Sequence, residues 1–215
     1  LAAAHRGAVG RLPYELTLRY GFEYVTLGLD EFVQRHAVSP VATLVESERH
    51  LTALQLQLRA DDFADDDLVG EDDQRDGLNW LAGFFHLVRF AEDRHLLKAG
   101  YQWDLEDTDG RNFRYLGHRV LAGAQTTLPR GEVRLGYDFD VHVRDYRNVN
   151  TTFPTAAPGT RERSDTEYNH TIWVARPLPR GFGVFAAGQL TDAQSNLDVF
   201  DFRRNVVTVG FTWSY

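Results

Sequence analysis

Several residue types are missing from this sequence, and each absence narrows what the protein can be. None of its 215 residues is cysteine or methionine. Without cysteine there are no disulfides, thiolate metal sites or cysteine nucleophiles. No run approaches the roughly 18 consecutive apolar residues of a membrane-spanning helix, so a helical span is excluded. Basic residues number 23 against 31 acidic ones and form no basic face, which argues against nucleic acid as a partner.

The chain also lacks the features of an ordinary start. Its first residues, LAAAHRGAVG, have neither the basic region nor the apolar stretch of a signal peptide. Together with the missing initiator, this indicates a processed chain or the C-terminal part of a longer one. Nothing in the composition divides residues 1–215, so we expect a single domain.

Alternation of apolar and polar residues is the dominant pattern that is present. In GEVRLGYDFDVHVRDY (131–146), every odd position from 133 to 143 is apolar, and the even positions are charged, histidine or glycine. A period of two is typical of a strand with one apolar face. The pattern recurs, with a short stretch near 1–9, and predicts about ten strands. The clearest further segments are 13–26, 50–59, 79–90, 94–107, 165–177, 182–192 and 205–215.

The connections between these segments differ in length. Tight turns at 91–94, 128–131 and 178–181 alternate with longer polar connections such as 147–165 and 191–201. Short turns at one end and long loops at the other are typical of bacterial outer-membrane barrels. Lipid tolerates no open sheet edge, so closure is expected. The long connection at about 26–45 would fall at the wrong end, which indicates a longer strand from residue 13, a missed strand, or a partial barrel.

Three segments carry a resemblance to a known family. They are GYQWDLEDTDGRNFRYLGHRV, GEVRLGYDFDVHVRDY and SNLDVFDFRRNVVTVGFTWSY. Residues 76–215 resemble the C-terminal barrel found behind tetratricopeptide repeats in proteobacterial outer-membrane proteins, of which surface lipoprotein assembly modifiers are the best-described relatives. The resemblance implies an outer-membrane location, recognition of the last strand and Tyr215 by the barrel-assembly machinery, and a surface or periplasmic protein partner.

The expected fold is therefore all-β, an antiparallel up-and-down transmembrane β-barrel of about ten strands, possibly part of a larger barrel. Polar residues opposite the apolar faces would point into the lumen, as an ion-selective pore lining or as a salt-bridged plug. The lumen-facing candidates are Lys98, Gln102, Asp104, Arg119, Glu132, Arg134, Asp138, Asp140, His142, Arg144 and Arg204. The expected lipid-interface aromatics are Trp80, Trp103, Trp213 and Tyr215.

The sequence predicts a role in transport, secretion or surface-assembly anchoring, without chemistry, cofactor or metal of its own. One alternative is an outer-membrane hydrolase or acyltransferase with inward-facing catalytic residues, because histidine, serine and aspartate are available at His118, His142, His170, Ser164 and Asp165. No GxSxG or HExxH spacing supports it. A second alternative is a soluble barrel that binds a ligand with its apolar face turned inward. The acidic run 61–76 could bind calcium but lacks the EF-hand spacing, so a solvated outer loop is expected.

Overall fold

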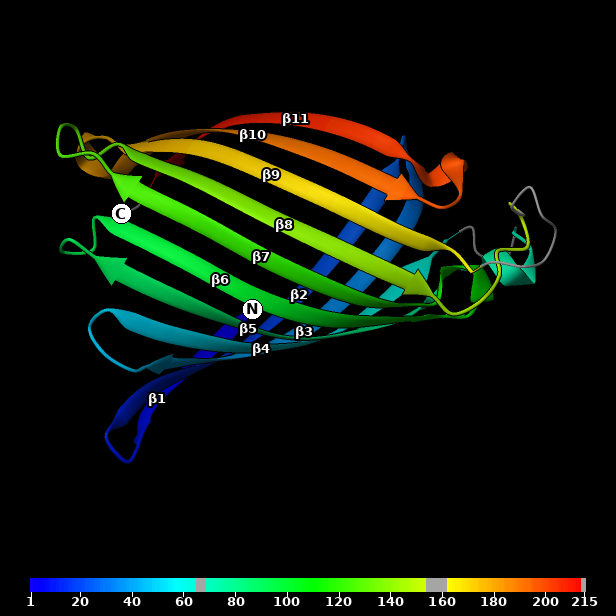
Figure 1. Ribbon diagram of the computed structural model, residues 1–215, viewed down its shortest axis with the longest axis horizontal. Coiled ribbons are helices and arrows are strands. Elements are labelled where there is room, and N and C mark those ends of the chain that lie inside the picture. The colour runs from blue at the N-terminus through cyan, green and yellow to red at the C-terminus, as the bar shows by residue number, and fades with distance from the viewer. Residues whose placement is uncertain (65–68, 154–161, 214–215) are drawn as a thin grey trace.

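The protein is one antiparallel sheet. The computed structural model describes residues 1–64, 69–153 and 162–213, and in them eleven strands each pair with the next along the chain. The sheet curves so that β1–β3 pass behind the middle strands in Figure 1. The strands are β1 (Ala2–Val9), β2 (Leu12–Leu27), β3 (Asp30–Val45), β4 (His50–Phe63), β5 (Gly77–Phe90), β6 (His95–Thr108), β7 (Tyr115–Thr127), β8 (Arg134–Tyr146), β9 (Ser164–Pro177), β10 (Phe182–Ser195) and β11 (Phe202–Trp213).

The all-β, up-and-down antiparallel architecture is confirmed, with eleven described strands in place of about ten. The sheet is open, because β1 and β11 each pair on one side only within the described residues. Since neighbours alternate in direction, β1 and β11 run the same way. The other elements in the described part of the chain are short 3-10 helices, η2 (Glu71–Asp73), η3 (Arg111–Phe113), η4 (Pro179–Gly181) and η5 (Asp198–Phe200). None of the described helices is long and apolar enough to cross a membrane.

The strand that the sequence did not reveal is β3. Residues 30–45 form a full strand paired with β2 and β4, so the expected long connection at 26–45 was wrong. Its alternation is hidden because apolar and polar residues occur on both faces and Pro40 lies within it, where proline is rarely tolerated in a strand. A two-residue connection joins it to β2, and Gly28 there has a φ of 71°.

The added strand restores a consistent arrangement of loops. The connections 10–11, 46–49, 91–94, 128–133 and 178–181 lie at one end of the sheet, and all are short. The opposite end carries 28–29 and the longer connections 64–76, 109–114, 147–163 and 196–201. Figure 1 shows the short turns on the left and the longer connections on the right. We call these ends the short-turn end and the long-loop end.

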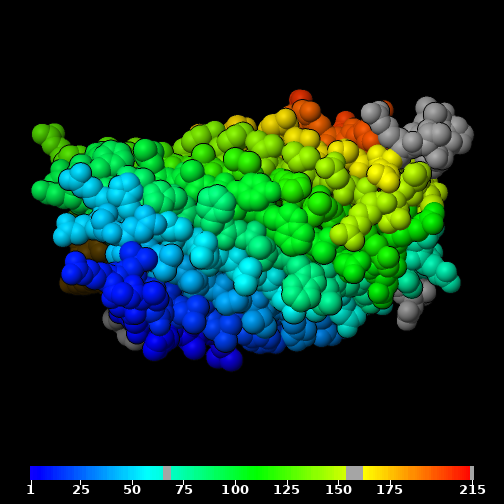
Figure 2. All heavy atoms as spheres, turned by 60° about the horizontal axis from the view of Figure 1, so that its bottom comes forward, coloured from blue at the N-terminus to red at the C-terminus, as the bar shows by residue number. Residues whose placement is uncertain are grey.

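Burial in this sheet is the reverse of that in a soluble protein. On β11, Val207 and Phe211 are 79% and 78% exposed, whereas Asp104 on β6 and His142 on β8 are 6% and 4% exposed. The register places alternate residues of every strand on one face, so one face is mainly apolar and the other mainly polar. We call them the apolar face and the polar face. Viewed from outside, the strands form one continuous curved wall (Figure 2).

The register of β3 can be tested by disulfide formation, because the protein has no cysteine of its own. Val38 pairs with Leu58 across β3 and β4. The double variant Val38→Cys/Leu58→Cys should cross-link on mild oxidation, since directly opposed strand residues lie within disulfide reach. Cross-linking is read as a mobility shift on non-reducing gels. Val38→Cys/Leu54→Cys is the matched control, four residues out of register; cross-linking of the control alone would contradict the assigned register.

Candidate functional site

The polar face carries ion pairs that pass from strand to strand. On the side nearer the N-terminus, Arg35 on β3 binds Asp61 on β4 through two hydrogen bonds of 2.8 and 3.1 Å. Arg59 on β4 lies 3.2 Å from Asp61 and 3.1 Å from Glu106 on β6, across the intervening β5. Asn79 on β5 donates to the same Glu106 at 2.8 Å. Strands β3 to β6 are therefore linked by side chains as well as by backbone.

A second group continues across β6 to β9. His142 Nε2 lies 3.0 Å from Asp104 Oδ1, and its Nδ1 lies 3.0 Å from the guanidinium of Arg119. Arg144 pairs with Glu167 on β9 at 3.2 Å. Nearer the short turns, Lys98 on β6 pairs with Asp138 on β8 at 2.7 Å. The charges of the polar face are thus largely compensated within the sheet, which lowers the cost of removing them from water.

Two glycines on β7 make these long contacts possible. Gly117 lies on the polar face and pairs with Asp104 on β6 and Arg144 on β8, and Gly123 pairs with Lys98 and Asp138. A Cβ atom at Gly117 would collide with the Asp104 carboxylate and the His142 ring, and one at Gly123 would collide with Lys98 and Asp138. Glycine is required here because the side chains of β6 and β8 meet over the β7 backbone.

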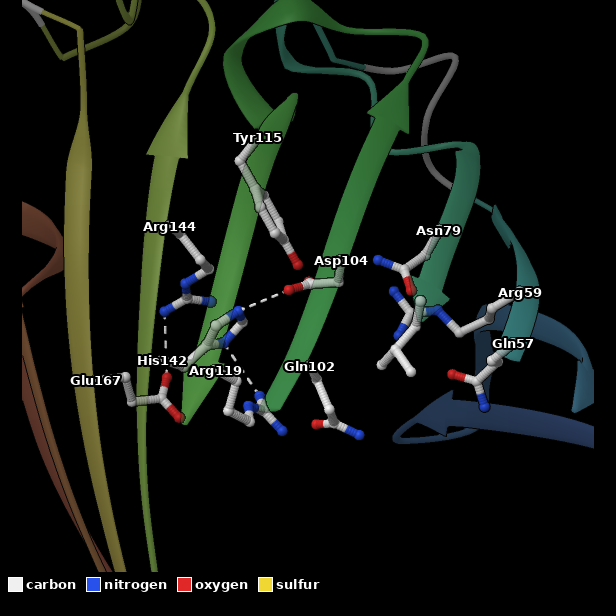
Figure 3. Close-up of a pocket in the computed structure, with 11 residues that line it drawn as sticks. Gln57, Arg59, Asn79, Gln102, Asp104, Tyr115, Arg119, His142, Arg144 and Glu167 are labelled. Carbon is white, nitrogen blue, oxygen red and sulfur yellow. Dashed lines mark hydrogen bonds and ion pairs between the residues drawn. The ribbon is translucent and has the colours of Figure 1, made fainter. Parts of the chain in front are cut away.

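The polar face is hollowed at its centre. A cavity of about 300 Å³ lies among side chains from β4 to β9. Figure 3 shows Arg144 and Glu167 on one side, Gln57 and Arg59 on the other, and Asp104 between them. Its lining is Gln57, Arg59, Asn79, Leu81, Gln102, Asp104, Tyr115, Arg119, His142, Arg144 and Glu167. The hollow offers charges of both signs and amide groups, which suits hydrated or polar solutes better than apolar ones.

The structure places nearly all of the sequence-predicted polar residues on this face. Five of them line the hollow: Gln102, Asp104, Arg119, His142 and Arg144. Lys98, Asp138, Asp140, Arg134 and Arg204 lie on the same face of β6, β8 and β11. Glu132 differs, because it precedes β8 in the turn 128–133 and lies beside Arg134 at the short-turn end.

The predicted interface aromatics lie on the apolar face toward its ends. On β5 and β6, the last apolar residues of the apolar face before the long loops are Leu78 and Leu105. Trp80 and Trp103 are the next residues on that face, one position farther from the long loops. Trp213 lies at the short-turn end of β11 and stacks on Phe182 with ring centroids 6.3 Å apart. Tyr215 lies outside the described residues.

The residues considered for a hydrolase are not brought together. His118 and His170 are on the apolar face, where each Nδ1 bonds a tyrosine hydroxyl, from Tyr101 and Tyr137 respectively. Ser164 is bonded to Asp145 at 2.9 Å near the long loops. Both ring nitrogens of His142 are engaged by Asp104 and Arg119, and no described serine or threonine hydroxyl is bonded to it. The polar face therefore presents no activated hydroxyl among its described residues.

Sequence reasoning missed several members of the polar face. Arg59, Asp61 and Glu167 are as central to the ion pairs as the predicted residues. Asp165, considered only for the hydrolase alternative, lies 3.9 Å from Arg144. Their alternation was visible: Gln55, Gln57, Arg59 and Asp61 occupy successive positions on one side of β4. Assigning alternate residues of every strand to one face would have identified these residues. The contacts across β5 and β7 could not be read from the sequence, because they join strands that are not neighbours.

The loops at the long-loop end are tied together. Asn112 is 2% exposed and donates to Asp73 at 2.8 Å, while its carbonyl oxygen accepts from the backbone of Thr151 at 3.1 Å. Thr151 also donates to Asp72 at 3.0 Å. Asp72 and Asp73 are thus held by protein donors, which differs from the solvated loop expected for 61–76; residues 65–68 of that run lie outside the described residues. The described residues contain no group of three or more metal-ligating side chains.

Two sequence comparisons with known proteins found no relative of this chain. A scan against protein-family models finds no match to the chain. A search of curated proteins finds no similar sequence. The site is therefore interpreted from its own geometry.

The role of the β7 glycines gives a direct test of the polar face. Gly117→Val should destabilise the protein by about 1–3 kcal/mol, because the added side chain collides with Asp104 and His142. Ala122→Val on the same strand is the control, since residue 122 lies on the apolar face and is exposed. Thermal unfolding in detergent, followed by circular dichroism, measures the difference. Equal stability of the two variants would mean that β6 and β8 do not meet over β7.

Proposed function

We propose that this protein is an integral β-barrel of the bacterial outer membrane. Its role is transport, secretion or the anchoring of a surface assembly, and its polar face forms the interior. Membrane lipid is its main partner, and the barrel-assembly machinery recognises its C-terminal strand. The observation that supports the proposal is the path of the apolar face across the sheet, which follows the inclination expected of strands in a membrane.

Pairing partners trace one line across the sheet from Leu16 on β2 through Tyr101 on β6 to Arg203 on β11. The apolar stretches do not stay on this line. On β2 the stretch is centred near Tyr20, four residues toward the long loops, and on β6 it is centred at Tyr101 itself. On β11 it is centred near Val209, six residues toward the short turns. The centre therefore moves by about one residue for each strand crossed.

This drift has a simple geometric meaning. One residue is about 3.3 Å along a strand and neighbouring strands are about 4.8 Å apart, so the apolar stretches form a band inclined by about 35° to the pairing line. Strands of transmembrane barrels tilt by about 35–45° from the membrane normal. A band of constant height around such a barrel must drift across the register in this way. Soluble sheets have no reason to keep an exposed apolar band at one height.

Acidic residues lie at the edge of the apolar band that is nearer the long-loop end. Asp62, Asp107, Asp145 and Asp192 are the first acidic residues on the apolar face as β4, β6, β8 and β10 approach the long loops. Relative to the same pairing line they move toward the short turns from β4 to β10, as the apolar centres do. Carboxylates are excluded from hydrocarbon, so their aligned positions suit the boundary between lipid and water.

A barrel requires that the edge strands β1 and β11 both be paired. The free edges of β1 and β11 would leave backbone groups unpaired in hydrocarbon, where each costs several kcal/mol by a rough estimate. Because β1 and β11 run the same way, a barrel closes either through a parallel seam between them or through an odd number of intervening strands. Either closure would turn the polar face inward.

The exposed apolar face argues against the soluble ligand-binding alternative. Such a barrel needs its apolar residues inside, whereas Leu56, Val120 and Ile172 are 58%, 59% and 65% exposed. A contiguous surface of this kind in water would promote association. The hydrolase alternative draws no support from the position of His142, whose two ring nitrogens are both occupied.

Single cysteines on β4 test the membrane location. Leu56→Cys and Gln57→Cys are adjacent but lie on opposite faces. After labelling with a fluorophore and reconstitution into bilayers, the label at 56 should be quenched by nitroxide-bearing lipid and the label at 57 by aqueous iodide. The measurement is steady-state quenching. Iodide quenching of both labels, with no effect of the lipid quencher, would remove the proposal.

Conductance in planar bilayers separates the transport role from the anchoring role. An open barrel should show steady single-channel conductance, with cation preference reduced in Asp140→Asn because a polar-face carboxylate has been neutralised. Asp198→Asn, in a long-loop 3-10 helix, is the control and should leave selectivity unchanged. Clean insertion without conductance would indicate a filled interior and an anchoring role.

A further inference from the structure

Every short turn carries one arginine. Arg11, Arg49, Arg94, Arg130 and Arg180 occupy the five connections at the short-turn end, and all five side chains are exposed. None of them forms an ion pair with a described residue, whereas Arg35, Arg59 and Arg144 on the polar face are each bound to carboxylates. Because the turns gather at one end of the sheet in Figure 1, these five arginines belong to the short-turn end.

The charge of this end differs from that of the whole chain. The short turns, with two strand residues on each side, also contain Arg89, Arg134 and Arg176. Facing them are five carboxylates, Glu46, Glu48, Glu92, Asp93 and Glu132. Of these, Asp93 pairs with Arg89 at 3.5 Å and Glu46 is bonded to the hydroxyl of Thr52. Eight arginines against five acids leave this end positive, although the chain carries a net charge of -8.

An apolar hollow opens on the apolar face next to the short-turn arginines. Its volume is about 480 Å³, and its walls come from β5 to β9. Ala124, a small residue, lies between Leu97 and Tyr137 in the register and forms the depression. Its border reaches His95 beside the turn that holds Arg94. Arg176 lies two residues beyond Val174 on β9, exposed and against the turn at Gly131. The hollow thus joins an apolar seat to nearby unpaired guanidinium groups.

We propose that the short-turn end binds the phosphate headgroups of an anionic phospholipid leaflet, with one acyl chain seated in the hollow beside Ala124. The inference rests on the proposed membrane location. Guanidinium groups bind phosphate oxygens in pairs and hold their charge at any physiological pH. Basic residues just outside an apolar band are attracted to anionic lipid, and long side chains there extend to the headgroups. The occupant must combine a phosphate with a hydrocarbon chain, which is the chemistry of a phospholipid.

Quenching of tryptophan by brominated lipids tests this inference. The protein is reconstituted into phosphatidylcholine bilayers that contain brominated phosphatidylglycerol or brominated phosphatidylcholine, and the relative binding constant is taken from the quenching curves. The Trp173 indole lies on the polar face, where its Nε1 donates to Asp138 at 3.2 Å, so the reporter is a tryptophan placed at Ile172 on the wall of the hollow. All proteins compared, including the one called wild type below, carry this tryptophan and have phenylalanine in place of their own four. Wild type should prefer the anionic lipid by about fivefold or more, and high salt should remove the preference.

Two matched double variants test whether the lipid preference depends on the short-turn arginines. Arg130→Gln/Arg180→Gln, both within LPRG turns, should reduce the preference to within about twofold. Arg147→Gln/Arg203→Gln removes two arginines at the long-loop end and should leave the preference at the wild-type value. Ala124→Phe fills the hollow and should weaken quenching by both lipids, because residue 124 is exposed on the apolar face.

The possible failures are distinguishable. If both lipids quench wild type equally, the protein is in the bilayer but the headgroup inference is overturned, and the arginines would face an acidic protein instead. An equal loss in the two double variants would remove the assignment to the short turns, and unchanged quenching in Ala124→Phe would remove the acyl-chain seat. If neither lipid quenches and the label at Leu56→Cys reports water, the membrane proposal itself fails.

Discussion

Inverted burial is the constraint on which the rest of the structure depends. Each strand from β2 to β10 is hydrogen-bonded to a neighbour on both sides, so the sheet needs no apolar core to hold its main chain together. What remains is to match each face to its surroundings: under the proposed membrane location the exposed apolar side chains lie against hydrocarbon, and the polar side chains compensate one another. The ion pairs from Arg35 to Glu167 meet the second requirement. Membrane lipid would meet the first in the proposed location.

The same constraint explains details that otherwise look unrelated. Gly117 and Gly123 leave space on the polar face so that charges on β6 and β8 can reach each other. The tyrosine–histidine bonds on the apolar face, such as Tyr137 to His170 at 2.8 Å, satisfy polar atoms that would have no water nearby in the proposed lipid environment. At the long-loop end, polar loops bond to one another through Asn112. At the short-turn end, unpaired arginines face outward.

Much of the fold could be predicted from the sequence because a period of two is directly visible in most strands. The pattern assigned GEVRLGYDFDVHVRDY to a strand, and residues 134–146 form β8. It failed at β3, where His36, Pro40 and Ala42 share the apolar face with Val38 and no alternation is visible. Which residues lie on the polar face could be predicted from their odd or even positions along each strand. Their pairing across an intervening strand depends on curvature and register, which the sequence does not display.

The orientation of the strands in a bilayer tests the central claim most directly. Polarised infrared spectroscopy of the protein in oriented phospholipid layers measures the angle between the strands and the membrane normal. The inclined apolar band requires ordered strands tilted by about 35–45°. A β-sheet spectrum with strands lying in the membrane plane, or with no preferred orientation, would show that the apolar face is not held across the bilayer and would contradict the account.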